Sequence, residues 1–146
     1  MALLRKQSGV QNVLEAEFVW NWDDTMVDIN GATLDFKTNT SGIVADVINL
    51  PPGAVVIGGD VTTETAVTGS TAYNVSVGDS ASATRYLGVT DKTAAALTAL
   101  VPTGYFGLGE QIRLTVTPTI ADSTAGKVVL RVQYVLRNRA NEVSSH

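Results

Sequence analysis

The sequence predicts an all-β protein: an antiparallel β-sandwich, jelly-roll-like, with an N-terminal arm. Three features of the chain support this fold class. From Gly42 onward Thr, Val, Gly and Ser predominate, and β-branched residues favour the pleated, half-buried surface of a strand. Stretches of alternating polar and apolar residues recur along the chain, which is the period of a strand with one buried face. Gly, Pro and Asn separate these stretches at the short spacing of a sandwich, and a closed barrel is the alternative architecture.

The length fits a single domain with its own core. The chain has 146 residues, and a domain of that size buries about 70% of the surface that its unfolded chain exposes. We divide it into an N-terminal arm (1–12), a sandwich domain (13–141) and a C-terminal tail (142–146). Residues 1–12 show no sustained periodicity, and the last five residues are mostly polar.

The first predicted strand is Val13–Trp22. Phe18 and Trp20 share one parity with other apolar residues, whereas Glu15 and Glu17 have the opposite parity. We therefore expect one face of this strand to lie in the core.

A hairpin and a further strand follow. Met26–Ile29 and Ala32–Phe36 flank Asn30-Gly31, a pair that tolerates the positive φ angles of a type I′ turn. Ile43–Leu50 is the next strand, and Pro51-Pro52-Gly53 ends it because proline lacks the donor that a β-ladder needs.

The middle of the chain is predicted to contain a broken strand and a second hairpin. Gly58-Gly59 follows a strand at Ala54–Ile57 and marks a bulge or a close backbone approach. Beyond it, Val61–Val67 and Tyr73–Val77 are expected to pair around Thr68-Gly69-Ser70.

The last third is predicted as strands with one helical turn or two. A strand is expected at Thr84–Val89, and Asp91–Leu100 has the N-cap residue and the alanines of a short helix. Gln111–Ile120 and Lys127–Asn138 are expected to form a closing hairpin. Pro118 indicates that the first of these is an edge strand near its end.

Composition excludes several function classes. The chain has no Cys, and its single His stands at position 146, so thiol chemistry, imidazole catalysis and Cys/His metal sites are not expected. A net charge of -4 opposes nucleic-acid binding through phosphate attraction. No apolar run is long enough to span a membrane, and Leu3-Leu4 precedes Arg5-Lys6, the reverse of a signal peptide. We expect no cofactor, no nucleic acid and no membrane partner.

The motifs that suggest chemistry have simpler structural explanations. Gly104–Gly109 lacks the strand-to-helix setting of a phosphate loop. Asp24, Asp28 and Asn30 lack the rest of a calcium loop. A hydrolase needs only two carboxylates across a substrate, so it stays open as an alternative. The acids weighed for that role are all expected in turns or next to glycine, where carboxylates commonly bind backbone amides: Asp23, Asp24, Asp60, Asp79 and Asp122.

Two surface features point to binding. Trp20 and Trp22 have the parity of core residues, and an interface role or a sugar-binding platform is the alternative for them. Basic residues gather near both chain ends, whereas most acids lie between. A solvated face is the simpler explanation, and the sharper hypothesis is that both termini dock on an acidic partner surface. The basic residues are Arg5, Lys6, Lys127, Arg131, Arg137 and Arg139.

The segment Leu50–Gly59, followed by Val61–Ala66, resembles small virion proteins of tailed bacteriophages of the head decoration, or cement, type. The resemblance covers roughly Ile48–Glu142 and rests on turn and strand patterning, with no catalytic signature. Similar segments follow downstream: Val77–Asp79, Arg85–Leu87, Pro102–Tyr105, Thr124–Lys127, Val132–Val135 and Arg139–Glu142.

The resemblance implies a non-enzymatic sandwich that binds the exterior of a phage capsid and bridges subunits of the major capsid protein. Synthesis in the host cytoplasm and a homo-oligomer, either dimer or trimer, are expected with it. The alternative is a receptor- or carbohydrate-binding module associated with a tail or fibre. We expect the interface to include Leu3, Leu4, Arg5, Lys6, Val10, Trp20, Trp22, Arg137 and Arg139.

Overall fold

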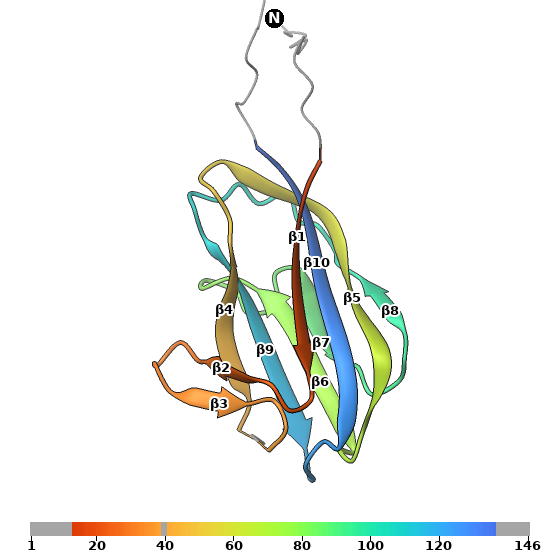
Figure 1. The fold of residues 1–146 in the computed structure, drawn as a ribbon. Helices are drawn as coiled ribbons and strands as arrows, with labels where there is room; N and C mark the ends of the chain where they lie inside the picture. The colour runs from red at the N-terminus through yellow and green to blue at the C-terminus, as the bar shows by residue number, and fades with distance from the viewer. Residues whose placement is uncertain (1–12, 39–40, 137–146) are drawn as a thin grey trace, which may run out of the picture.

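Two four-stranded sheets and a separate hairpin make up the computed structural model (Figure 1). The structure describes residues 13–38 and 41–136. Sheet I has the strand order β1-β10-β5-β8, sheet II has the order β4-β9-β6-β7, and β2 pairs with β3. The strands are β1 (Leu14–Asn21), β2 (Thr25–Val27), β3 (Thr33–Asp35), β4 (Ile43–Asn49), β5 (Ala54–Thr68), β6 (Ala72–Gly78), β7 (Leu87–Asp91), β8 (Leu97–Ala99), β9 (Gln111–Thr119) and β10 (Ala125–Leu136).

The strand order is that of a jelly roll. Without the hairpin β2–β3, eight strands remain, and in chain order sheet I holds the first, eighth, third and sixth of them. Sheet II holds the second, seventh, fourth and fifth, and every pairing is antiparallel. Each consecutive pair except β6–β7 therefore crosses from one sheet to the other. The predicted all-β, jelly-roll-like sandwich is confirmed.

Two predicted hairpins are wrong because of this topology. Val61–Val67 belongs to β5 in sheet I, whereas Tyr73–Val77 belongs to β6 in sheet II. In the same way, β9 and β10 lie in different sheets. A short connection can join two neighbouring strands of one sheet or two strands of facing sheets, because packed sheets are only about 10 Å apart. The turn residues alone therefore do not distinguish a hairpin from a crossing.

The helical turns predicted at Asp91–Leu100 are wrong. The segment contains β8 and runs beside β5, where the amide of Thr63 donates to the carbonyl oxygen of Ala96 at 3.0 Å. Lys92 is 1% exposed, and its Nζ donates to the Ala96 carbonyl at 2.8 Å and to Thr98 Oγ1 at 3.0 Å. Hydrogen bonds to a neighbouring strand thus replace those of a helix, and tertiary contacts override local propensity.

The strands predicted on either side of Gly58-Gly59 form one strand, β5. Its pairing with β10 omits Ile57, which is the extra residue of a bulge. Gly59 has a φ of 131°, and a Cβ there would lie 2.1 Å from the carbonyl oxygen of Arg131. The predicted bulge and the predicted close approach are both confirmed, and only glycine fits this position.

The hairpin β2–β3 is confirmed, but its turn is not type I′. The amide of Gly31 donates to the Asp28 carbonyl at 3.0 Å, and the Asp28 amide donates to the carbonyl of Ala32 at 2.8 Å. Gly31 has a φ of 83°, whereas Asn30 has no positive φ. Only the glycine takes the left-handed conformation, as in a three-residue hairpin loop.

Strand β9 is central in sheet II, but near its end, at Pro118, it has a partner on one side only, as the edge position predicted there requires. The pairing of β4 with β9 stops at Val116, and no described strand lies beside Pro118 on that side. The carbonyl of Thr119 accepts from the Thr71 amide on the β6 side. The backbone N–H and C=O groups of successive residues in a strand point alternately to its two sides. Because the Thr119 carbonyl points toward β6, the N–H group that Pro118 lacks would point away from β6.

The core lies between the two sheets and is centred on buried aromatic residues. Trp20 Nε1 donates to the Tyr73 hydroxyl at 3.0 Å, and both residues are 1% exposed. The Trp20 ring centroid lies 5.7 Å from that of Phe18 and 5.9 Å from that of Phe36. The core role predicted for Trp20 from its parity is therefore confirmed.

A strained turn follows β9. The amide of Ala121 donates to the Thr119 carbonyl at 2.9 Å, and Ile120 between them has a φ of 73°. This is the rare γ-turn with a positive central φ, a conformation that β-branched residues avoid. Ile120 is also 78% exposed, so packing does not offset the strain.

Replacing Ile120 by glycine is therefore expected to raise the free energy of unfolding by about 1 kcal/mol, because glycine adopts this conformation without strain. Chemical denaturation measures the change. Ile120→Val is the matched control, since it keeps the β-branch, and it is expected to stay within about 0.5 kcal/mol of the original protein. A glycine variant that is no more stable than the valine variant would contradict the strain.

Candidate functional site

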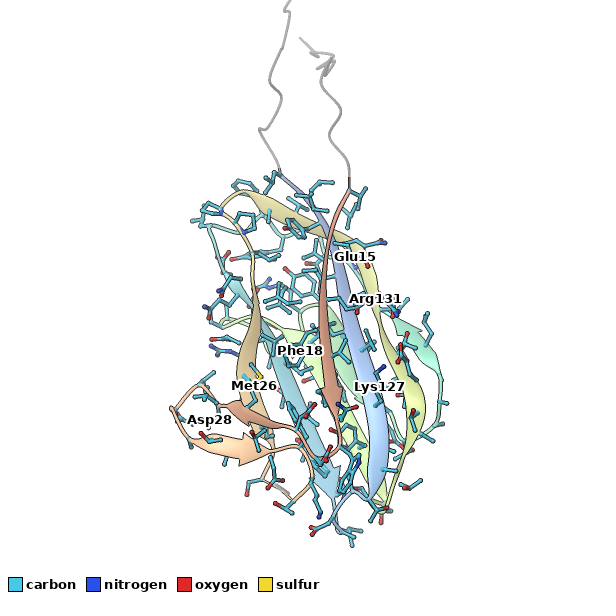
Figure 2. The ribbon with its side chains drawn as sticks, viewed as in Figure 1. Glu15, Phe18, Met26, Asp28, Lys127 and Arg131 are labelled. Atoms are coloured by element: carbon cyan, nitrogen blue, oxygen red, sulfur yellow. The ribbon has the colours of Figure 1, made fainter. Side chains whose placement is uncertain are left out.

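The outer face of sheet I is broad and carries paired charges. The strand register places Glu17, Arg131 and Asp60 in one row across β1, β10 and β5. Arg131 Nε donates to Glu17 Oε2, and its Nη1 donates to Asp60 Oδ1, each at 3.1 Å. Arg131 thereby links three strands, and Figure 2 shows it on β10 above Lys127.

Further charged groups extend this row. Lys127 Nζ lies 2.7 Å from Glu64 Oε2, and this hydrogen bond lowers the pKa of the Glu64 carboxyl. Glu15 accepts a longer hydrogen bond, 3.4 Å, from the side chain of Gln133. We call Glu15, Glu17, Asp60, Glu64, Lys127 and Arg131 the charged face. Its four carboxylates and two cations leave two negative charges in excess.

An apolar row borders the charged face at the end of sheet I where β1 begins and β10 ends. Ala54 and Val56 are 2% exposed in the core, so Val55 between them points outward, beside Val135 of β10. Val13 precedes β1 and is 53% exposed, and Ile57 at the bulge is 41% exposed. We define the apolar row as Val13, Val55, Ile57 and Val135.

The outer face of sheet II is different in character. Small uncharged side chains of β6 and β9 occupy its centre, including Asn74, Thr115 and Thr117. Its ion pair joins Arg113 and Asp46 at 2.8 Å. This face offers hydroxyl and amide groups but little charge.

A buried carboxylate holds the loop between β6 and β7. Asp79 is 2% exposed and accepts hydrogen bonds from the amides of Ala81 at 2.9 Å and Ser82 at 2.8 Å. It also forms an ion pair with Arg85, whose guanidinium lies 3.8 Å from the centroid of the Tyr105 ring. Burial alone would raise the pKa of Asp79, but the bonds from Arg85 and the two amides lower it below its usual value.

A second carboxylate, Glu110, lies in the same small pocket as Asp79. It accepts from the Tyr105 hydroxyl at 3.0 Å and from the Leu108 amide at 2.6 Å, and backbone hydrogen bonds lower its pKa. Both acids are therefore ionised at neutral pH, whereas a glycosidase needs one carboxyl with a raised pKa as general acid. The arrangement favours loop bracing over hydrolysis.

The binding of backbone amides predicted for the acids is confirmed for Asp79, whereas Asp60 accepts from side chains. Asp60 lies within β5, where its Oδ1 accepts from Thr62 Oγ1 at 2.6 Å as well as from Arg131. The prediction failed because Asp60, which follows the glycine pair, lies in a continuous strand whose neighbours are β10 and β8. Sequence reasoning therefore missed the central row of the charged face. The outward parity of Glu15 and Glu17 was the available signal, but it does not say which strand lies beside β1.

The structure describes two of the nine predicted interface residues. Trp20 lies in the core and is not available to a partner, which corrects its assignment. Trp22 is half-buried, with Lys37 Nζ 5.1 Å from its ring centroid. The two indoles thus do not form a joint exposed platform for a sugar. The other predicted residues lie outside the described part: Leu3, Leu4, Arg5, Lys6, Val10, Arg137 and Arg139.

Two further features are absent from the described residues. In the ranges 13–38 and 41–136, no group of three or more Asp, Glu, His or Cys side chains is arranged to hold a metal ion. The same ranges contain no helix with the length and apolar character to cross a membrane.

No family model matches the sequence, and no curated protein matches it. The fold matches chains of three phage capsid structures. For the cyanophage Pam1 capsid asymmetric unit the TM-score is 0.65, with 23% identity and 94% of each chain covered. For the acidic stable capsid of Helicobacter pylori bacteriophage KHP30 the TM-score is 0.57, with 22% identity over 92% of this chain and 94% of that one. For the capsid of Ralstonia phage GP4 the TM-score is 0.55, with 12% identity and 92% of each chain covered. Because all three identities are below 25%, these matches establish a shared fold alone.

Proposed function

We propose that the protein is a non-enzymatic structural protein of a phage virion that binds the outer surface of the capsid and bridges subunits of the major capsid protein. One observation carries this proposal: over more than nine-tenths of its length, the chain shares its fold with chains of three phage capsid structures. The sequence resemblance to decoration proteins adds the exterior position and the bracing role.

The surface of the molecule suits a brace. Bridging two subunits requires broad contact, on the order of 800 Å² of each partner for a stable interface. Sheet I and sheet II each present a wide face, one charged and one rich in hydroxyl groups. When one shell offers many identical sites, modest contacts add up through avidity and oppose expansion of the shell.

The terminal segments are the proposed contact regions. The described residues hold thirteen acids and six Lys or Arg, whereas residues 1–12 and 137–146 hold one acid and four Lys or Arg. The body is thus acidic and the two ends are basic, which favours docking of the ends on an acidic surface. The proposed contacts are Leu3, Leu4, Arg5, Lys6, Val10, Trp22, Arg137 and Arg139, in a dimer or trimer that matches the symmetry of the shell.

Co-sedimentation with undecorated phage heads tests the proposal. We expect the purified protein to sediment with the heads and to stay in the supernatant without them. Removal of residues 1–12 is expected to weaken this binding at least tenfold, while the melting temperature stays within about 2 °C because these residues precede the first core strand. Failure of the full-length protein to sediment would contradict capsid binding and favour the tail-associated alternative.

A further inference from the structure

We infer that the N-terminal segment of one copy docks on the outer face of sheet I in a second copy. Leu3 and Leu4 of the segment cover the apolar row, and Arg5 and Lys6 pair with the carboxylates next to it. This inference deepens the proposed function, and it rests on that function only for the expectation of a homo-oligomer.

The apolar row gives the segment a place for its two leucines. Val55 and Val135 are paired across β5 and β10, and the exposed Val13 and Ile57 flank them. The row of Glu17, Arg131 and Asp60 separates these side chains from a second apolar row on the same face, so they form a short apolar strip bordered by charge. The second row consists of Val19, Val129 and Leu97. Such a strip favours a ligand that joins apolar and charged groups.

The charges next to the strip match those of the segment. Glu15 stands two residues after Val13, and in the described part of the chain it has no cationic partner, only the amide of Gln133 at 3.4 Å. Glu17 is 49% exposed and shares Arg131 with two other carboxylates. Residues 1–12 contain two basic residues and no acid. Docking therefore supplies the positive charge that the charged face lacks.

The order of groups also agrees. The outward positions at the start of β1 are Val13, Glu15 and Glu17, which are apolar, acidic and acidic, at intervals of about 6.8 Å. In an extended Leu3–Lys6 segment successive side chains alternate between two sides, so each side presents a leucine and then, about 6.8 Å further on, a basic residue. A segment parallel to β1 thus places each group beside its complement.

A second copy is the better source of the segment. Because β1 enters the sheet at the end that holds the apolar row, a segment from the same chain must reverse its direction to lie on this face. Twelve extended residues reach up to about 40 Å, enough to meet a neighbour. A symmetric oligomer then exchanges segments between all its copies.

The absence of cysteine from the chain allows a direct test by disulfide trapping. A Leu4→Cys variant and a size-tagged Ile57→Cys variant are purified separately, mixed and mildly oxidised. A size-tagged Val89→Cys variant is the control. We expect the yield of disulfide-linked mixed dimer to be at least about fivefold higher with Ile57→Cys than with Val89→Cys, because docking raises the effective concentration of the thiols. Val89 lies on β7 in sheet II and is 69% exposed against 41% for Ile57, so accessibility alone favours the control.

Charge reversal tests the second half of the inference. Glu15→Lys with Glu17→Lys in the tagged partner is expected to lower the yield of mixed dimer at low salt. Arg5→Glu with Lys6→Glu in the Leu4→Cys variant is expected to restore it. If Glu15→Lys with Glu17→Lys leaves the yield of mixed dimer unchanged, the proposed charge pairing is wrong.

Two outcomes would overturn docking on a second copy. One is an equal yield with Ile57→Cys and Val89→Cys. The other is an internal disulfide in a chain that carries both Leu4→Cys and Ile57→Cys, with no mixed dimer from the separate variants. Val13→Cys replaces Ile57→Cys if the latter does not fold. Because trapping needs no phage heads, its failure leaves co-sedimentation, and with it the proposed function, to be judged separately.

Discussion

Replacing Trp20 by alanine is expected to lower the free energy of unfolding by about 3 to 5 kcal/mol, the range for removing a large aromatic residue from a core. The indole is 1% exposed, lies close to the rings of Phe18 and Phe36, and donates to the Tyr73 hydroxyl. Its loss leaves a cavity between the sheets and removes the hydrogen-bond donor of a buried hydroxyl.

Trp22→Ala is the matched control on the same segment of chain. Trp22 is half-buried, so its removal is expected to cost less than about 1.5 kcal/mol. Urea denaturation followed by far-ultraviolet circular dichroism measures both, since each variant alters the tryptophan fluorescence. Equal losses in the two variants would contradict the placement of Trp20 in the core. A loss of this size is large against the 5 to 15 kcal/mol typical of whole domains.

The inside and outside of individual strands were predictable from the sequence. In β1 the parity of Phe18 and Trp20 against Glu15 and Glu17 is a local property, because side chains alternate in any strand. The glycine pair in β5 likewise predicted a bulge, since glycine at a close backbone approach has a local signature.

The partners of each strand were not predictable in this way. Arg131 meets Glu17, 114 positions away in the chain, and Asp60, 71 positions away. These contacts depend on which strands the jelly roll brings together, and a consecutive pair such as β9 and β10 gives no sign that it crosses between sheets. The charged face was therefore missed, although the alternation of polar and apolar residues indicates on which side of its strand each charged side chain lies.

The sequence resemblance and the structural match also differ in extent. The resemblance began near Ile48 and left the first third of the chain without a relative. The match to the Pam1 capsid chain covers 94% of this chain, so it includes most of the described part of the first third. Strand β1 explains the difference. It forms the edge of sheet I beside β10, and many different sequences of alternating polar and apolar residues can form such a strand, so the fold can be shared where the sequence is not.

The second large effect is expected at Asp79. Replacing it by asparagine keeps the shape of the side chain but removes the charge that Arg85 and the amides of Ala81 and Ser82 stabilise. We expect a loss of about 3 kcal/mol, the lower end of the range for breaking a buried ion pair, because the Arg85 side chain is 19% exposed and regains some solvent. Asp46→Asn is the control: Asp46 also binds an arginine but is 24% exposed, so about 1 kcal/mol is expected there.

The pH dependence of this loss gives an independent check. The pKa of Asp79 in the folded protein lies below its ordinary value of 3.8, so the folded state binds fewer protons there than the unfolded state. Its contribution to stability is present above that value and disappears as the pH falls through the folded pKa. The difference in free energy of unfolding between the original protein and Asp79→Asn should therefore be smaller at about pH 2.5 than at about pH 6. A difference between them that is the same at both pH values would mean that the carboxylate charge is not what holds the loop between β6 and β7.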